Sequence, residues 1–301
     1  MFIINHKVKK MDPLIQNPLE ERISQYIVEK TPHLTILTPC YGGMCHLNYL
    51  SCVLATRELF DRLGCPLTIE FCKNDSLVSR ARNNLIARAM FNSKSTHFLF
   101  IDSDITWNPI DIFRLMLDDK SLVGGIYPLK KYNWEKLLPS TVPGEVSNVQ
   151  TWLDRKNAGP LKTFLDDESM IQTNLLNYNL NHLNNQVTIE NGLIKVKHIA
   201  TGFMMIQRAT LEKMMMAFPS TKYEADVQFL RPEENIYAYA LFDCGVEEGH
   251  YMSEDWLFCN RWRKMGGDVY VDVQIALTHS GTEDYRGCFF ASLPIQFNQY
   301  S

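Results

Sequence analysis

Short apolar runs alternate with segments of helical period along most of the chain. The runs are rich in β-branched and aromatic residues, which is typical of strands buried in a sheet. Several of the helical segments end at glycine, a common helix stop. The pattern predicts an α/β fold. The predicted strands are 34–37, 66–72, 97–101, 121–128, 200–206 and 269–277, and the predicted helices are 19–29, 46–63, 76–90, 110–118, 208–216 and 254–265.

Three stretches depart from this rhythm. Residues 1–33 are interrupted by prolines and are predicted to form an N-terminal arm, which leaves 34–301 as a single catalytic domain. Residues 133–190 are long and rich in Asn, Leu and Asp, so we predict an insertion there. It is either an acceptor-side loop or lid, or a surface elaboration without a catalytic role. Residues 218–249 carry aromatic and acidic side chains and suit a loop region beside a site.

Two glycine signals refine the second half of the chain. Asn191-Gly192 lies inside the strand-like stretch 187–199 and is a strong hairpin signal. Gly202 lies in the predicted strand 200–206, where the missing side chain allows another group to approach the backbone closely.

Composition and charge narrow the class of protein. The chain has 301 residues, of which 46% are apolar and 21% charged, as in an ordinary globular protein. Its net charge of −4 gives no sign of nucleic-acid binding. The eight cysteines show neither a CxxC pair nor zinc-ligand spacing, so buried free thiols in a reducing compartment are expected. No signal peptide or transmembrane run is found, which predicts a cytoplasmic protein.

Two carboxylates stand where an apolar run stops. Asp102 and Asp104 follow the strand 97–101, and ligands of open α/β sheets bind outside the carboxyl ends of the strands. Alternate residues of an extended chain face the same side, so both acids are able to address one hard cation, or one a cation and the other a sugar hydroxyl. The alternative is an Asx turn that ends the strand.

Other candidates also follow predicted strands. The loop after strand 34–37, with Thr38, Pro39 and Tyr41, is suited to receive a nucleobase and ribose, or is a tight turn. Arg80 and Arg82 lie near the start of helix 76–90 and are able to reach a phosphate, although an arginine there is more often solvated or paired with a carboxylate. Asp75 or Ser76 is predicted to cap this helix.

The C-terminal third adds acids and a histidine. Glu254 and Asp255 open a helix with Ser253 as the candidate N-cap and Gly266-Gly267 as the stop. Acids in a first turn are also explained by the helix dipole alone. His279 follows the strand 269–277, where it either completes a metal site or is an ordinary surface or core residue.

Taken together, the motifs resemble the GT-A glycosyltransferases, and among them the compact bacterial, phage and large-virus enzymes. The resemblance covers about residues 34–281 through TPCYGG, SLVSRARNNL, FLFIDSDITWNP, VGGIYPLKK, ATGFMMIQR, SEDWLFCNRWRKMGG and VDVQIALTHSG. It implies a central, mostly parallel sheet flanked by helices, with the nucleotide half first and the acceptor half second. It also implies transfer of a sugar from a UDP- or GDP-sugar to a glycan or a protein-linked acceptor. If the chain is viral, it would be located in the infected host cell or associated with the virion.

The resemblance also implies roles for single residues. Asp255 matches the base that activates the acceptor in inverting enzymes, with Glu254 as its neighbour. Mn²⁺ or Mg²⁺ is the expected cofactor, because a divalent cation stabilises the departing diphosphate. The predicted metal ligands are Asp102, Asp104 and His279. The predicted donor-binding residues are Thr38, Pro39, Tyr41, Asp75, Arg80, Arg82, Asp102, Ser103 and Asp104, and the predicted acceptor-binding residues are Gly202, Phe203 and Trp256.

Three alternatives stay open at the level of sequence. The order of the arginine-asparagine, DxD and late histidine motifs also resembles the Anp1-like mannosyltransferases, which retain configuration. A nucleotidyltransferase would likewise place acids and a metal on an α/β sheet, although no Gly-rich basic triphosphate loop is found. A glycan-binding protein that lost activity would keep the fold without turnover. The departures from a compact family member, before residue 34 and at 133–190, leave the acceptor open.

Overall fold

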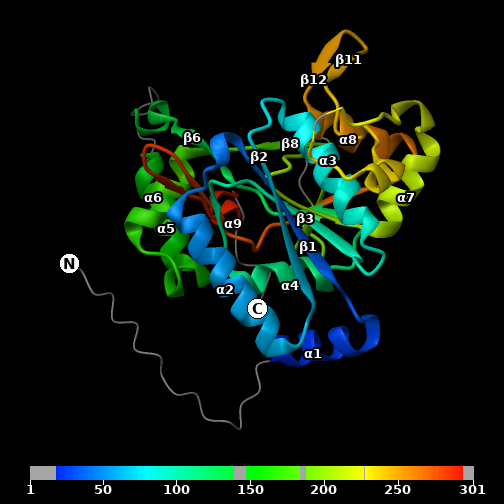
Figure 1. Cartoon of the computed structure of the whole chain (residues 1–301). Coiled ribbons are helices and arrows are strands. Elements are labelled where there is room, and N and C mark those ends of the chain that lie inside the picture. The colour runs from blue at the N-terminus through cyan, green and yellow to red at the C-terminus, as the bar shows by residue number, and fades with distance from the viewer. Residues whose placement is uncertain (1–17, 139–146, 184–187, 227, 294–301) are drawn as a thin grey trace.

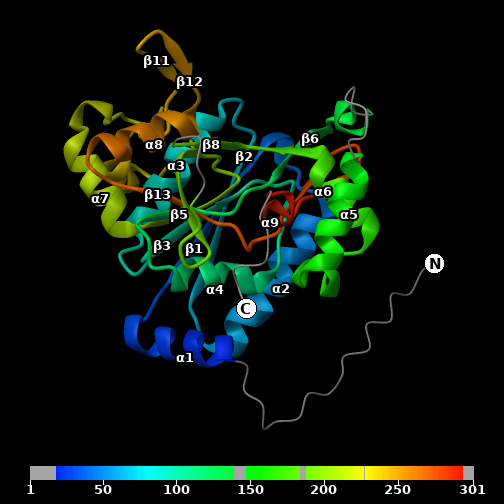
Figure 2. The ribbon, with the colours of Figure 1, turned by 180° about the vertical axis from the view of Figure 1, so that it is seen from behind.

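The central element of the molecule is a twisted sheet with helices on both faces (Figures 1 and 2). The computed structural model describes residues 18–138, 147–183, 188–226 and 228–293, and within them the main sheet has eight strands. Strands β10 and β9 are antiparallel to both of their neighbours, so the other six run in one direction. The predicted mostly parallel central sheet is confirmed. Its spatial order is β2 (Leu67–Lys73), β1 (Leu34–Cys40), β3 (His97–Ile101), β10 (Phe203–Gln207), β5 (Leu122–Gly124), β13 (Val269–Asp272), β9 (Leu193–Ile199) and β8 (Leu180–His182).

Strand alternation divides the core into two layers. On β3, Phe98 and Phe100 belong to one apolar cluster, and Leu99 and Ile101 belong to the other. The first cluster is covered by α3 (Val78–Phe91), α7 (Arg208–Ala217) and α8 (Glu254–Lys264), and the second by α1 (Pro18–Lys30), α2 (Leu47–Leu63) and α4 (Pro109–Leu117). Because both faces of β3 are buried, its continuous apolar run is the expected sequence for this position.

Residues 133–190 break the strand–helix rhythm, as predicted, and add a small layer beside the sheet (Figure 1). Helix α6 packs against α5 and α9, and Leu161, Met170 and Ala291 form a separate small core there. The last strand of the region, β8, is the edge strand of the main sheet, so this part of the region belongs to the central fold. The elements are η2 (Trp134–Leu137), α5 (Asn148–Ala158), η3 (Pro160–Thr163), α6 (Asp167–Leu175), β7 (Leu176–Tyr178), which pairs with β6 (Pro128–Tyr132), and, from the C-terminal end, α9 (Phe289–Ser292).

A second, three-stranded sheet lies next to the end of β3. It consists of β4 (Ile105–Thr106), β14 (Thr278–Ser280) and β15 (Asp284–Arg286). The single strand predicted at 269–277 is wrong in its second half, because β13 ends at Asp272. The Asp272 carboxylate there accepts a hydrogen bond from the Gln274 N–H at 2.8 Å, which turns the chain. The chain then enters the second sheet, so His279 lies inside a strand rather than beyond one.

The predicted hairpin at Asn191-Gly192 is confirmed only as a turn. Both residues have positive φ, 54° and 82°, as the tightest hairpin turns require. On its N-terminal side only an isolated bridge, Glu190 to Leu193, is formed, and residue 187 lies outside the described residues. Strand β9 pairs along its length with β13 and β8 instead, so the predicted local partner is wrong. The predicted run 121–128 is also two strands, β5 and the beginning of β6.

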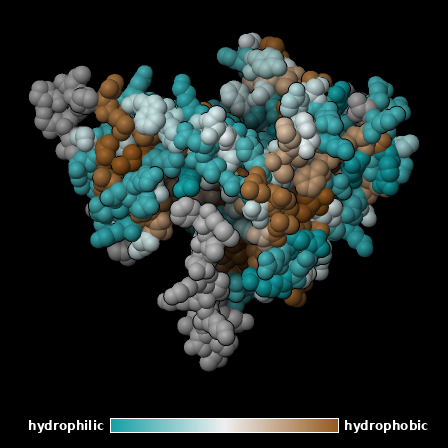
Figure 3. All heavy atoms as spheres, turned by 60° about the vertical axis from the view of Figure 1, so that its left-hand side comes forward, coloured by the Kyte–Doolittle hydropathy of each residue, from teal (hydrophilic) through white to brown (hydrophobic). Residues whose placement is uncertain are grey.

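Predicted helix ends and irregular regions are mostly confirmed. Gly64 ends α2 with φ of 68°, as its position in the sequence indicated. The described part of 218–249 contains the short helices η4 (Pro219–Thr221) and η5 (Pro232–Tyr237) and strand β11 (Gly245–Glu247), which pairs with β12 (His250–Met252). None of the described helices is long and apolar enough to span a membrane. On the face shown in Figure 3, apolar residues form separate patches within a mostly polar surface.

The cysteines follow the sequence prediction in part. None of the eight is in a disulfide. Cys40, Cys65, Cys72 and Cys259 are buried, as expected for structural thiols. The expectation of burial is wrong for Cys45 and Cys244, which are exposed.

Candidate functional site

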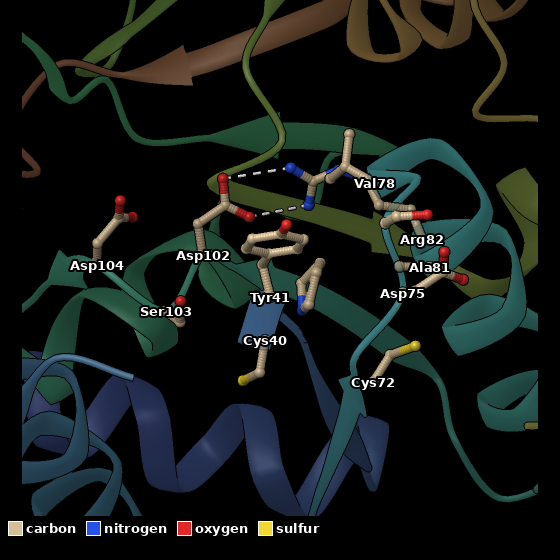
Figure 4. Close-up of a pocket in the computed structure, with 12 residues that line it drawn as sticks. Cys40, Tyr41, Cys72, Asp75, Val78, Ala81, Arg82, Asp102, Ser103 and Asp104 are labelled. Carbon is tan, nitrogen blue, oxygen red and sulfur yellow. Dashed lines mark hydrogen bonds and ion pairs between the residues drawn. The ribbon is translucent and has the colours of Figure 1, made fainter. Parts of the chain in front are cut away.

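A cavity of about 270 Å³ lies where strands β1, β2 and β3 end (Figure 4). The loop after β1, which continues as the 3₁₀ helix η1 (Tyr41–Gly43), forms one wall, and the turn after β3 forms another. The start of α3 closes a third side. This is the edge at which ligands bind in open α/β sheets, as the sequence predicted. The lining residues are Pro39, Cys40, Tyr41, Cys72, Asp75, Ser76, Val78, Ala81, Arg82, Asp102, Ser103 and Asp104.

The turn that carries the two aspartates is held by backbone hydrogen bonds from three other parts of the chain. The Asp102 N–H donates to the carbonyl of Gly202 at 3.1 Å, and the Ser103 carbonyl accepts from His46 at 2.9 Å. The Asp104 carbonyl accepts from the N–H of Ser280 at 2.8 Å. The backbone of the turn is therefore fixed by groups that the fold brings in from distant segments.

Arg82 is the centre of a buried charge network. Its side chain is 4% exposed, and two of its nitrogens bind the Asp102 carboxylate at 2.9 and 3.2 Å (Figure 4). Its Nε binds Glu254 at 3.2 Å, and Thr201 also donates to that carboxylate. Burial would lower the pKa of Arg82, but the two carboxylates outweigh this and raise it above its ordinary value. Arg82 thus connects the turn after β3 to the first turn of α8.

Asp104 has a different set of partners. The Lys130 ammonium lies 2.6 Å from Asp104 Oδ2, and His279 Nε2 lies 3.4 Å from the same oxygen. His279 Nδ1 donates its proton to the carbonyl of Pro128 at 2.9 Å, which leaves Nε2 turned toward Asp104. Burial would raise the pKa of Asp104, but the His279 ring and the Lys130 ammonium group beside the carboxylate hold it at about 2. The carboxylate is therefore charged at any ordinary pH.

The three predicted metal ligands are brought together only in part. Asp104 and His279 fit a divalent cation, because a ring Nδ1–H bound to a backbone carbonyl is the usual support of a metal-binding histidine. Asp102 lies in the same turn, but both its oxygens bind Arg82, and Figure 4 shows its carboxylate directed away from Asp104. In this conformation the described residues contain no cluster of three or more His, Cys, Asp or Glu side chains arranged to hold a metal. The two-residue donor set fits, and the third ligand does not.

The first turn of α8 holds the two acids predicted for catalysis. Asp255 is 8% exposed; its Oδ1 accepts hydrogen bonds from the Ser253 hydroxyl and from the Trp256 N–H. Burial raises the pKa of Asp255, and repulsion from Glu254 adds to the increase. Ser253 occupies the N-cap position, but its hydroxyl binds this carboxylate instead of capping the helix. Neither acid lines the cavity. Glu254 is joined to the cavity wall by its ion pair with Arg82, and Asp255 is its neighbour in the same helical turn.

Several predicted donor-binding residues lie in the cavity wall, and two do not. Tyr41 is 77% exposed and leaves a ring face available for stacking. Asp75 binds Arg80 at 2.8 Å, so Arg80 is paired with a carboxylate. Thr38 is fully buried beneath the cavity with its hydroxyl 2.5 Å from that of Tyr49. The predicted cap of α3 is wrong, because Leu77 is the N-cap residue and Asp75 accepts from the Leu77 N–H outside the helix.

The predicted acceptor-binding residues are dispersed. Phe203 is fully buried in the core, with its ring 6.3 Å from that of Trp107. Trp256 is half-buried and stacks on His198 with ring centroids 4.9 Å apart. Gly202 shows the close approach that the sequence indicated, since a Cβ there would lie 2.7 Å from the ring of Tyr127. Gly202 also accepts the hydrogen bond that fixes Asp102, so its backbone serves the site directly.

Gly202→Ala is expected to lower the free energy of unfolding by about 1–3 kcal/mol, because the added methyl group has to displace the buried Tyr127 ring. Gly245→Ala is the matched control, since no described atom lies within 4 Å of its Cβ position. Urea denaturation of both variants measures the difference. Equal stabilities would show that the Tyr127 contact does not constrain this turn.

Two residues of the site were not predicted from the sequence. The sequence predicts no role for Lys130 or Tyr127, although both fall within the motif VGGIYPLKK. Lys130 binds Asp104, and the Tyr127 ring lies 5.1 Å from that of His279. The basic pair at Lys130 and Lys131 so soon after the paired glycines was the available signal, but nothing local shows which acid it meets.

Comparisons with known proteins give only distant similarities. No protein-family model and no curated protein matches the sequence. Among solved structures, A197 from STIV is 12% identical with a TM-score of 0.43, covering 83% of this chain and 86% of that one. UDP-glucose pyrophosphorylase complexed with UDP-glucose is 9% identical (TM-score 0.34; 94% and 88% covered). 4-diphosphocytidyl-2C-methyl-D-erythritol synthase from Anaerococcus prevotii is 8% identical (TM-score 0.30; 69% and 96% covered). Similarities this low assign neither a family nor an activity, and the glycosyltransferase relationship stays a prediction.

Proposed function

We propose that this protein is a cation-dependent glycosyltransferase that uses a nucleoside-diphosphate sugar. The observation that supports the proposal most directly is the placement of the Asp102–Asp104 turn. It borders a cavity with an exposed aromatic ring at Tyr41, and Arg82 connects it to Glu254 in the first turn of α8. A nucleoside-diphosphate sugar needs an aromatic or polar surface that binds its nucleobase and positive charge beside its phosphates. The acceptor hydroxyl needs a carboxylate that removes its proton.

The residues of the chain divide the work in this proposal. Tyr41 and Asp75 bind the nucleoside end of the donor in the cavity. Asp104 and His279 hold the divalent cation, which supplies charge neutralisation for the departing diphosphate. Arg82 keeps Asp102 and Glu254 in fixed positions and partly neutralises these two carboxylates beside the cavity.

Asp255 accepts the proton of the acceptor hydroxyl. A carboxylate with a pKa raised by burial is a stronger base than a solvated one, which suits this role. A base acting on the acceptor implies attack on the face of the sugar opposite the leaving group, so inversion is the expected stereochemistry. The acceptor is a glycan or a protein-linked glycan.

Donor binding tests the proposal. In a thermal-shift screen, a UDP- or GDP-sugar is expected to raise the unfolding temperature when Mn²⁺ or Mg²⁺ is present and to have a smaller effect with EDTA. A ligand at about 100 times its Kd would add about 2.7 kcal/mol of stability. With the donor identified, release of the nucleoside diphosphate and the anomeric configuration of the product are measured by NMR.

Each other outcome points to a specific alternative. Release of pyrophosphate from a nucleoside triphosphate would replace glycosyl transfer with nucleotidyl transfer. Retention at the anomeric carbon would remove Asp255 from its role as base. Binding of glycans without turnover of any nucleotide sugar, in the presence of either cation, would contradict an enzymatic function.

A further inference from the structure

Lys130 occupies the place where a cation would meet Asp104. Its ammonium is 2.6 Å from Asp104 Oδ2, and His279 Nε2 is 3.4 Å from the same oxygen. An ion held jointly by Asp104 and His279 has to approach this oxygen. The ammonium group and the ion would then share one carboxylate at close range, where two positive charges repel each other.

Two contacts of strand β6 determine the position of Lys130 beside Asp104. Lys130 lies in β6, and the carbonyl of Pro128 in the same strand orients His279. Its aliphatic stem runs beside Gly281, since a Cβ at Gly281 would lie 2.9 Å from Lys130 Cδ. One short strand thus sets the direction of the histidine and delivers the competing ammonium group.

The two positively charged side chains bound to this turn, Arg82 and Lys130, differ in how easily they can move away from it. The Arg82 side chain is 4% exposed and is held by Asp102 and Glu254 together. The Lys130 side chain is 34% exposed and has a single carboxylate partner among the described contacts. Moving Arg82 would bury a charged guanidinium group without its two carboxylate partners, Asp102 and Glu254, whereas moving Lys130 exposes an ammonium group that water solvates well.

We propose that Lys130 is a displaceable counter-ion that balances Asp104 in the metal-free site and sets the affinity for the divalent cation by competing with it. The inference rests on the cation site of the proposed function. When the cation binds, the Lys130 side chain moves away from Asp104 toward solvent and the cation takes over its charge-balancing role. The pair is partly exposed, so the competition is moderate in strength.

Titration of the full chain with MnCl₂ in the absence of any nucleotide tests the proposal, with free Mn²⁺ measured by electron paramagnetic resonance. Lys130→Met keeps the stem beside Gly281 and removes the charge, and is expected to lower the Kd for Mn²⁺ about two- to fivefold. Lys130→Arg keeps the charge and is expected to stay near the wild-type Kd. Lys131→Met is the matched control, because it changes the net charge equally at an exposed neighbouring position.

An unchanged or weaker Mn²⁺ affinity in Lys130→Met would overturn the proposal, as would an equal gain in Lys131→Met or a lack of Mn²⁺ binding by all four proteins. Lys130→Gln gives the same comparison if the methionine variant proves unstable. The measurement is independent of transfer. If the wild-type protein turns over a nucleotide sugar but Lys130→Met leaves the Mn²⁺ affinity unchanged, only the role of Lys130 is rejected. If Lys130→Met lowers the Kd for Mn²⁺ but no nucleotide sugar is turned over, only the transferase function is rejected.

Discussion

Arg82→Met is expected to lower the free energy of unfolding by about 3–5 kcal/mol, the usual loss when one member of a buried ion-pair network is removed. Methionine fills much of the space of the arginine stem, so the main cost is electrostatic. Glu254, whose side chain is 13% exposed, would keep only the hydrogen bond from Thr201 among its hydrogen bonds to described residues, and Asp102 would lose both of its hydrogen bonds to the guanidinium group. Urea denaturation followed by circular dichroism measures the change.

Arg57→Met is the matched control for this loss. Arg57 also pairs with an aspartate at 2.9 Å, but both side chains are more than half exposed. Its removal is expected to cost about 1 kcal/mol or less. If the two variants were equally stable, the Asp102–Arg82–Glu254 network would have no greater effect than a surface ion pair. Arg82 would then no longer explain how the two acidic motifs are held.

The partners of Arg82 show where prediction from sequence stops. Position within the helix suggested that Arg82 would point toward the site, and it does border the cavity. Its partner Glu254 is 172 positions away along the chain, and no local pattern indicates which acid an arginine will meet across a fold. Both arginines at the start of α3 are paired with carboxylates, which is the commoner outcome for an arginine in this position.

Helices and strands were predictable from the sequence where a local pattern, such as an apolar run or a helix-ending glycine, determines them. The apolar run at β3 is buried on both faces, and Gly64 ends α2 through its positive φ. Errors arose where tertiary pairing decided the outcome. Strand β9 pairs with β8 and β13 rather than with the residues directly before the Asn191-Gly192 turn, and the chain after Asp272 enters a second sheet. Sequence alternation alone does not distinguish one long strand from two strands in different sheets.

The candidate site divides in the same way. Position at a strand end correctly indicated which loops surround the cavity, because the C-terminal ends of parallel strands share one edge. Burial of single side chains was not predictable. Thr38 and Phe203 point into the core, and Lys130 reaches Asp104 from a strand outside the main sheet.

Asp255→Asn is expected to reduce transfer about 10²–10⁴-fold, the contribution of a positioned general base, with little change in donor affinity. The substitution is close to isosteric, and an amide oxygen still accepts from the Ser253 hydroxyl and the Trp256 N–H. Because burial already disfavours the charged form of Asp255, a neutral side chain is tolerated by the fold. Initial rates of nucleoside-diphosphate release at saturating donor and acceptor measure the effect.

Asp272→Asn separates loss of the base from loss of a buried acid in general. Asp272 is 5% exposed, its pKa is likewise raised by burial, and it accepts a backbone hydrogen bond at 2.8 Å, but it does not line the cavity. Its variant is expected to keep transfer within about twofold of wild type, since it touches none of the reacting groups. Equal losses in both variants would attribute the effect to stability, and full activity in Asp255→Asn would move the role of base to Glu254 or to the donor itself. A selective loss at Asp255 would place proton removal at the first turn of α8, the helix that Arg82 connects to the aspartate turn beside the cavity.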